Sequence, residues 1–170
     1  MKPKFWRRVP ARVESYFAPT GLAARGAKVL KVDSEDRAHG NGAANVLDGD
    51  PGTFWHTRWQ PVNDPMPHEL IIDLGRELSI AGVTCWPRQD QSNGRIGDAE
   101  FYGSTKEDAW SEALARVRWI NTRDSQTARF KQPAQVRYLR MVVRSEVNGN
   151  PFVALADIDL LPAGQGAAKE

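Results

Sequence analysis

Between residues 27 and 162 the sequence alternates apolar and polar positions in short runs, the pattern of half-buried β-strands. In the run His68–Gly75, Leu70, Ile72 and Leu74 share one face, and Ala154, Ala156, Ile158 and Leu160 share a face near the end. The pattern predicts strands at residues 68–75, 78–86, 99–103, 117–120, 127–130, 138–144 and 154–160.

Turn signals separate the predicted strands. They include Asp64-Pro65, Asn93-Gly94, Gln132-Pro133 and Asn148-Gly149-Asn150-Pro151. Only Lys106–Ala115 has a helical pattern, and only for about two turns. Many short strands without helical connections predict an all-β protein, an antiparallel β-sandwich whose end loops carry the function.

The chain divides into one domain with two peripheral segments. Its 170 residues are enough for a single core. We expect residues 1–26 to form an N-terminal extension or linker, residues 27–162 the β-sandwich, and residues 163–170 a polar C-terminal tail.

Charge and apolar runs limit the partners. The first twelve residues hold five basic and no acidic side chains, which leaves 18 basic against 21 acidic residues in the body, a net charge of about −3. That balance does not favour nucleic acid. No apolar run approaches the roughly 20 residues of a membrane span, and residues 1–10 lack the apolar region of a signal peptide. If the protein is exported, its signal lies outside this chain.

The single cysteine, Cys85, cannot form an internal disulfide. It lies in the apolar run Ile80–Trp86, so we expect it to be an inert core residue.

The stretch Asp48–Thr53 combines oxygen side chains with a tight turn. Asp48, Asp50 and Thr53 are interleaved with glycine and proline. Calcium prefers six to eight oxygen ligands in flexible geometry, so the stretch is a candidate calcium loop, and Asp157 is a candidate distant carboxylate. The alternative is an ordinary turn closed by Asx hydrogen bonds.

A second candidate site combines aromatic rings with fixed polar groups. Sugar recognition needs an aromatic plane for the C–H face and hydrogen-bonding groups for the hydroxyl rim. Trp59 or Phe152 can supply the plane, while His56, Arg88 and Asn93 can supply donors and acceptors. Each also has a structural explanation, so the hypothesis requires that loops 33–64, 87–98 and 146–153 meet. Trp55 is expected in the core.

Several ordered motifs resemble one family. They are Asn41–Asn45 leading into Asp48–Thr57, Pro67-His68 with Ile72–Gly75, Pro87–Asp90 with Asn93–Ile96, Arg137–Arg140, and Asn148–Phe152. Over about residues 28–161 they resemble the discoidin, or coagulation-factor C-type, domains, and within them the bacterial family 32 carbohydrate-binding modules.

The resemblance implies an eight-stranded jelly-roll sandwich with a structural Ca²⁺ and a sugar site in the end loops. It implies that His56, Arg88 and Asn93 contact an axial 4-hydroxyl, and that Trp59 and Phe152 form aromatic walls. The implied calcium ligands are Asp48, Asp50, Thr53, Asp157 and Asn45 or Asn41, with Asp157 replacing a more usual glutamate. Some galactose binders have an acidic residue just before Asn-Gly. Here the sequence reads Ala38-His39-Gly40, which implies the loss of one hydroxyl contact.

These features together predict a non-catalytic module that binds galactose- or N-acetylgalactosamine-containing glycans. We expect it to be attached to further domains of an exported, carbohydrate-active bacterial protein, and therefore to be extracellular, cell-surface or periplasmic. An enzyme is disfavoured, because Cys85 is expected in the core and a pair of Asp48 and His56 would lack an orienting third group. The alternative is a discoidin-type module that binds another glycan, a protein or a membrane surface.

Overall fold

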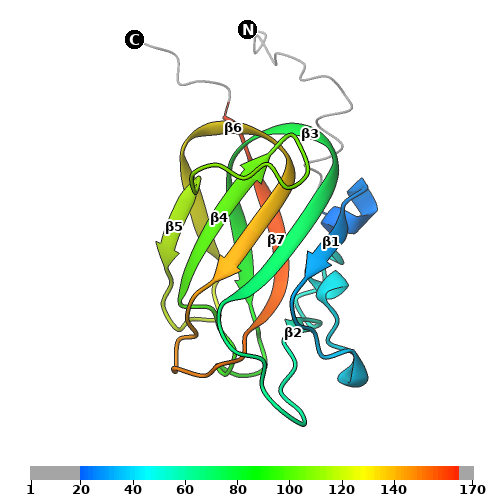
Figure 1. The fold of residues 1–170 in the computed structure, drawn as a ribbon, viewed down its shortest axis with the longest axis vertical. Coiled ribbons are helices and arrows are strands. Elements are labelled where there is room, and N and C mark those ends of the chain that lie inside the picture. Colours follow the sequence, from blue (N-terminus) through cyan, green and yellow to red (C-terminus); the bar gives the residue numbers. More distant parts are fainter. Residues whose placement is uncertain (1–19, 165–170) are drawn as a thin grey trace, which may run out of the picture.

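The computed structural model describes residues 20–164. Seven strands form an antiparallel β-sandwich (Figure 1). The strands are β1 (Lys28–Val32), β2 (Trp55–His56), β3 (His68–Pro87), β4 (Asp98–Ser104), β5 (Ala115–Arg118), β6 (Gln126–Val143) and β7 (Ala154–Pro162). The predicted all-β sandwich is confirmed, with seven strands where about eight were expected.

Two long strands, β3 and β6, run through both layers and bend at the end shown at the top of Figure 1. The first half of β3 pairs with β1 and with the second half of β6, and its second half pairs with β7 and the first half of β6. Predicted strands 68–75 and 78–86 are therefore two halves of β3, and predicted strands 127–130 and 138–144 both lie in β6. Gly75 at the bend of β3 has a φ of 80°.

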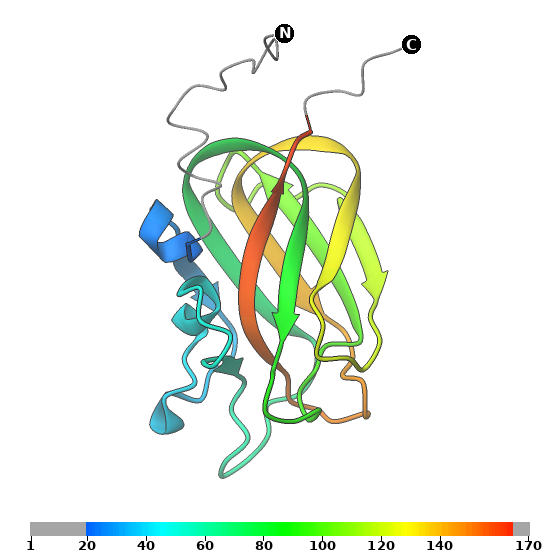
Figure 2. The same cartoon turned by 180° about the vertical axis from the view of Figure 1, so that it is seen from behind.

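Three short 3₁₀ helices lie beside β1, at the left of Figure 2: Leu22–Arg25, Arg37–His39 and Ala43–Leu47. Residues 20–26 of the expected extension pack on the sandwich, since Leu22 is fully buried. A Cβ on Gly21 would lie 2.5 Å from the backbone nitrogen of Gly49, so only glycine allows these two backbones to meet. Residues 1–19 and 165–170, which include most of the predicted extension and tail, lie outside the described residues.

The prediction of a helix at Lys106–Ala115 was wrong. These residues form turns and bends, and Ala115 begins β5. Asp108 has a left-handed backbone with a φ of 55°, which cannot continue a helix. The backbone nitrogen of Leu114 instead donates to the carbonyl of Phe101, so pairing with β4 overrides the weak helical pattern. The strand predicted at 117–120 begins and ends two residues earlier, as β5.

The core fills the space between the two layers with the side chains predicted from the alternation. Leu70, Ile72, Leu74, Leu139 and Ile158 are all almost fully buried. Trp55 and Cys85 also lie in this core, as predicted. Burial raises the pKa of the Cys85 thiol far above its ordinary value. Across residues 20–164, no helix is long and apolar enough to cross a bilayer.

Candidate functional site

The loops that follow β2, β3 and β6 all lie at one end of the sandwich, at the bottom of Figure 1. Together with residues 36–41 they surround an open pocket of about 300 Å³. The three loop regions predicted to converge therefore do converge, and all five predicted sugar-binding residues line this pocket. Its complete lining is Asp36, His39, Asn41, Phe54, His56, Trp59, Arg88, Gln91, Asn93 and Phe152.

His56 is 5% exposed and ends β2, which is held against β7 by pairing of His56 with Ala154. Its Nδ1 lies 2.5 Å from the carbonyl oxygen of Thr57. A carbonyl only accepts hydrogen bonds, so Nδ1 carries the proton and Nε2 of the neutral ring is an acceptor. Burial, together with the charge of Arg88, lowers the pKa of His56. The site therefore holds a neutral histidine with one acceptor nitrogen available to a ligand.

Arg88, directly after β3, is 9% exposed. Asp90 fixes its orientation, because Arg88 Nε and Nη2 donate to the two oxygens of that carboxylate at 2.6 and 3.0 Å. Its guanidinium also lies over the ring of Phe54, 4.4 Å from the ring centre. An arginine held this way presents fixed donors at little further entropic cost.

The two predicted aromatic walls differ in how firmly they are held. The ring of Phe152 stacks on His56 with 5.2 Å between ring centres. Trp59 is 40% exposed, and its indole nitrogen donates to Asp36 at 3.0 Å. His39 lies beside Trp59, with 5.6 Å between ring centres.

Asp36 is a pocket residue that the sequence analysis missed. It is buried, and its carboxylate contacts His39 Nδ1 at 2.8 Å in addition to Trp59. Burial raises the pKa of Asp36, but the hydrogen bonds from His39, Trp59 and Asn41 outweigh it, and the net pKa is lowered. The acidic residue judged absent from Ala38–Gly40 therefore has a counterpart two residues before Ala38, brought to the pocket by the bridge between Asp36 and Asn41.

A second missed residue, Glu146, organises the two loops that carry Asn93 and Phe152. This buried carboxylate accepts hydrogen bonds from the backbone nitrogens of Gly94, Asn148 and Asn150, at 2.9, 2.7 and 2.9 Å. Gly94 has a φ of 92°, and a Cβ there would meet the backbone of Ala154. Asn93 is thus presented, exposed, on a turn that only glycine can complete.

The predicted calcium loop, Asp48–Thr53, lies shortly before His56 in the sequence but does not line the pocket. Asp48 accepts a hydrogen bond from Thr53 Oγ1 at 2.6 Å and one from the Asp50 nitrogen at 2.8 Å, while Asp50 Oδ1 accepts from the Gly52 nitrogen. Asn45 uses its amide nitrogen to donate to the carbonyls of Gly40 and Phe54, both at 2.9 Å. The loop therefore satisfies many of its own polar groups.

Asp157 on β7 reaches this loop. Its Oδ1 lies 3.3 Å from the Gly49 nitrogen. Burial, and to a smaller extent the charges of Asp159 and Asp48, raise the pKa of Asp157 to about 6. The side-chain donors here are all oxygens, which fits Ca²⁺. Within residues 20–164, however, no three His, Cys, Asp or Glu side chains gather closely enough to hold an ion by themselves. An ion would also need Thr53 and backbone carbonyls.

Comparison with known proteins identifies a family over most of the fold. The sequence profile of the F5/8 type C domain matches residues 30–158. The chain belongs to the F5/8 type C, or discoidin, family. The match covers all three loop regions that form the pocket.

Family 32 carbohydrate-binding modules are among the solved structures whose fold is similar to that of this F5/8 type C domain. One relative is a sialidase of Micromonospora viridifaciens, 37% identical over 135 residues, which are 78% of this chain and 21% of the sialidase. Among solved structures, a Clostridium perfringens module in complex with GalNAc-β-1,3-galactose has a TM-score of 0.74 at 24% identity, covering 84% of this chain and 99% of that one. The family 32 module of C. perfringens NanJ, in complex with galactose, has a TM-score of 0.70 at 22% identity, covering 83% and 97%. The chain thus spans about a fifth of the sialidase's length.

Proposed function

We propose that this domain is a non-catalytic module that binds glycans ending in galactose or N-acetylgalactosamine. The observation that carries the proposal is the convergence of His56, Arg88 and Asn93 beside the Phe152 ring in one open pocket. The family assignment and the galactose-containing ligands of the two similar C. perfringens modules support it.

The pocket combines one acceptor with fixed donors. Neutral His56 offers Nε2 as an acceptor, and the guanidinium of Arg88 offers only donors. A sugar hydroxyl donates one hydrogen bond and accepts two, so one hydroxyl between these groups satisfies both. An axial 4-hydroxyl projects from the sugar ring towards them while the apolar face of the ring packs on Phe152. An equatorial 4-hydroxyl would leave these buried polar atoms unpaired.

Galactose and glucose test this proposal, because they differ only in the direction of the 4-hydroxyl. We expect galactose and N-acetylgalactosamine to bind with a Kd of about 10 μM to 1 mM, typical of an open, preformed site. Glucose should bind at least about fivefold more weakly, since one unpaired buried polar atom costs about 1–3 kcal/mol. Isothermal titration of both sugars measures the ratio, and equal affinities contradict the axial-hydroxyl argument.

An enzyme would require a reactive group in the pocket. The carboxylate of Asp36 is occupied by hydrogen bonds from His39, Trp59 and Asn41, and the one cysteine lies in the core. This supports a binding role over catalysis. The second candidate, binding to a membrane or protein, has weaker support, because the pocket is lined by polar and aromatic groups. A liposome pull-down compared with a glycan array separates the two.

We also propose that the Asp48–Thr53 loop and Asp157 hold a structural Ca²⁺. The all-oxygen donor set and the clustering of Asp48 with Asp157 support it. Saturating Ca²⁺, at about 100 times its Kd, should stabilise the native state by about 2.7 kcal/mol. For a domain of this size that raises the melting temperature by about 5–10 °C. Identical melting curves with Ca²⁺ and with chelator contradict the site.

The small share of the sialidase that this chain spans supports a role as one part of a larger protein. We propose that the module tethers such a protein to galactose-bearing surfaces outside the cell.

A further inference from the structure

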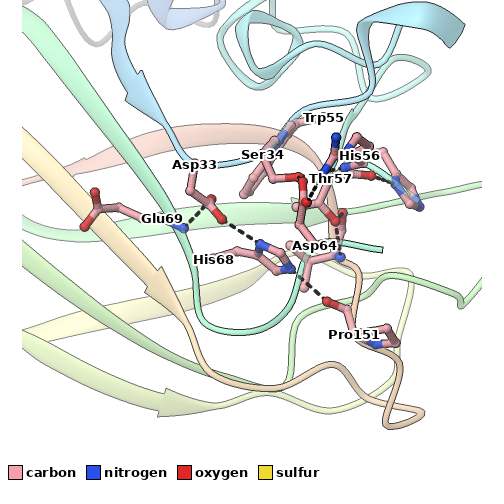
Figure 3. Close-up of polar contacts among 11 residues, drawn as sticks. Asp33, Ser34, Trp55, His56, Thr57, Asp64, His68, Glu69 and Pro151 are labelled. Carbon is pink, nitrogen blue, oxygen red and sulfur yellow. Dashed lines mark hydrogen bonds and ion pairs between the residues drawn. The ribbon is translucent and has the colours of Figure 1, made fainter. Parts of the chain in front are cut away.

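His68 is a buried histidine that does not line the pocket. It begins β3 with no exposed surface, and pairs across the sheet with Val143 of β6. Its Nδ1 lies 2.9 Å from Asp33 Oδ2, and its Nε2 lies 2.7 Å from the carbonyl oxygen of Pro151 (Figure 3). A single imidazole ring therefore spans two loops that are far apart in sequence.

Both partners of His68 are hydrogen-bond acceptors. A neutral imidazole has one donor nitrogen, so it can satisfy only one of them, whereas an imidazolium satisfies both. Burial lowers the pKa of His68, but the hydrogen bonds to Asp33 and Pro151 and the charges of Asp33 and Asp64 outweigh it, and the net pKa is raised. The two acceptors around the ring and the raised pKa both favour the imidazolium form of His68.

One end of this bridge continues directly into a wall of the pocket, and the other end supports the segment that carries His56. Pro151 is bonded to Phe152, the ring that stacks on His56. Asp33 is followed by Ser34. The carbonyl oxygen of Ser34 accepts a hydrogen bond from the Trp55 indole nitrogen at 2.9 Å, and its hydroxyl accepts one from the backbone nitrogen of Arg58 at 2.8 Å. Figure 3 shows Ser34 and Trp55 close to Asp33 and His68. The segment on which His56 lies is thus fixed to the same anchor as Phe152.

We propose that His68 is a positioning residue for the sugar site: its imidazolium holds the Asp33 and Pro151 loops together and so sets the distance between Phe152 and the His56 segment. The proposal rests on the function proposed above. It adds that sugar affinity depends on a proton that the sugar never contacts.

The charged groups near His68 determine what happens when that proton leaves. Asp33 is the carboxylate in direct contact, and Asp64 adds a more distant negative charge, itself paired with Arg58. Glu69, the next residue on β3, is paired with Lys31 and Arg140 instead. A neutral His68 keeps its remaining proton towards the charged Asp33 carboxylate, because a charge-assisted bond is the stronger one. The unprotonated Nε2 then faces the carbonyl oxygen of Pro151, and because both atoms are acceptors this hydrogen bond is lost.

Galactose affinity should therefore fall as the pH rises above neutrality through the raised pKa of His68. We expect at least about a fivefold loss, the lower end of typical coupling between linked groups. Asp33→Asn should abolish this alkaline loss. Its amide nitrogen can donate to an unprotonated Nδ1, so that the neutral ring keeps its proton on Nε2 and holds Pro151 at every pH. Glu69→Gln is the matched control and should keep the wild-type alkaline loss.

Isothermal titration with galactose between pH 6 and 9.5 measures these profiles. A wild-type affinity that is flat above neutrality, or an alkaline loss that persists unchanged in Asp33→Asn, overturns the proposal. Substituting His68 itself is a weaker test, because removing a fully buried charge partner can unfold the domain.

Nuclear magnetic resonance tests the same proposal without a sugar. The ¹⁵N signals of His68 should be those of a doubly protonated ring at pH 7, and the backbone amide of Phe152 should shift with the titration of His68. A neutral His68 at pH 7, or a Phe152 signal that ignores its titration, overturns the positioning role. If the wild-type protein binds no galactose at any pH but these signals behave as expected, it is the proposed function that fails.

Discussion

The segment of residues 48–59 contains two polar regions that are built in opposite ways. In the Asp48–Thr53 loop, exposed carboxylates bond to hydroxyl and backbone groups of the same short turn. At His56, only three residues later, the ring is buried and its neighbours Arg88 and Phe152 come from loops distant in sequence. The side-chain hydrogen bonds of the first region are mostly local, with Asp157 as a distant addition, whereas the second exists only when the whole fold is assembled.

Because of this difference, we expect one region to contribute mainly to stability and the other mainly to binding. A locally closed turn changes stability when it is altered, and it acts on binding only through the backbone that it supports. A pocket built from distant loops presents polar atoms that their own neighbours leave unsatisfied, so its alterations act on binding first.

The largest expected effect is on galactose affinity when the pocket's polar groups are removed. Arg88→Ala and His56→Ala should each weaken galactose binding by about 10- to 100-fold, the value of about 1.5–3 kcal/mol for a hydrogen bond involving a charged or buried group. Asp48→Ala should change the affinity by less than about threefold. It should instead lower the melting temperature by a few degrees, because it loses about 1 kcal/mol of local hydrogen bonding.

Titration calorimetry and melting curves of the three variants decide this point. If Asp48→Ala weakens galactose binding as much as His56→Ala does, the loop and the pocket act as one unit and the contrast between them is wrong.

The next largest expected effect is a loss of galactose affinity at acid pH. Burial keeps His56 neutral in the folded protein by lowering its pKa below the ordinary value of about 6.5. Protonation converts Nε2 from acceptor to donor, so galactose affinity should stay constant as the pH falls to that lowered pKa, and then decrease by about tenfold per pH unit. Calorimetry between pH 4 and 7 measures the midpoint. An acid midpoint above 6.5 contradicts the lowered pKa.

The two aromatic walls should show the smallest effects, and unequal ones. Phe152→Ala should weaken galactose binding by about three- to tenfold, because stacking is worth about 0.5–1.5 kcal/mol and the ring also packs on His56. Trp59→Ala should cost less, since Trp59 is 40% exposed and is held to the pocket through Asp36. A larger loss in Trp59→Ala would make the indole the main sugar platform. Fluorescence or calorimetric titration of the two variants ranks them.

Much of the fold was predictable because its signals are local. Alternation identified β3, β4, β6 and β7 and placed β5 two residues late, but it did not predict β1 or β2. Trp55 and Cys85 were correctly assigned to the core. The continuity of β3 and β6 was not predictable, since the turn signals at their bends also occur between separate strands. The helix at Lys106–Ala115 failed because pairing of Leu114 with Phe101 outweighs a pattern of two helical turns.

The pocket residues likewise divide into those that were predictable from the sequence and those whose role depends on the fold. His56, Arg88 and Phe152 belong to ordered motifs and were predictable from the resemblance. Asp36 was not, because it lies in an ordinary polar run and acquires its role from the indole of Trp59, which lies 23 residues later. Glu146 likewise becomes a loop anchor only through backbone nitrogens that the fold brings to it.

The bends in β3 and β6 determine how the domain faces its surroundings. Because each of these strands turns back on itself, both ends of β3 lie at the pocket end of the sandwich, with His68 at its start and Arg88 just past its finish. β7 runs antiparallel to the second half of β3, from Ala154 beside the pocket to Pro162 near the bends (Figure 2). Any chain that continues beyond β7 therefore leaves from the end opposite the pocket. Such an attachment keeps the pocket loops unobstructed, and the length of a linker there would set the reach of the proposed tether without altering the pocket.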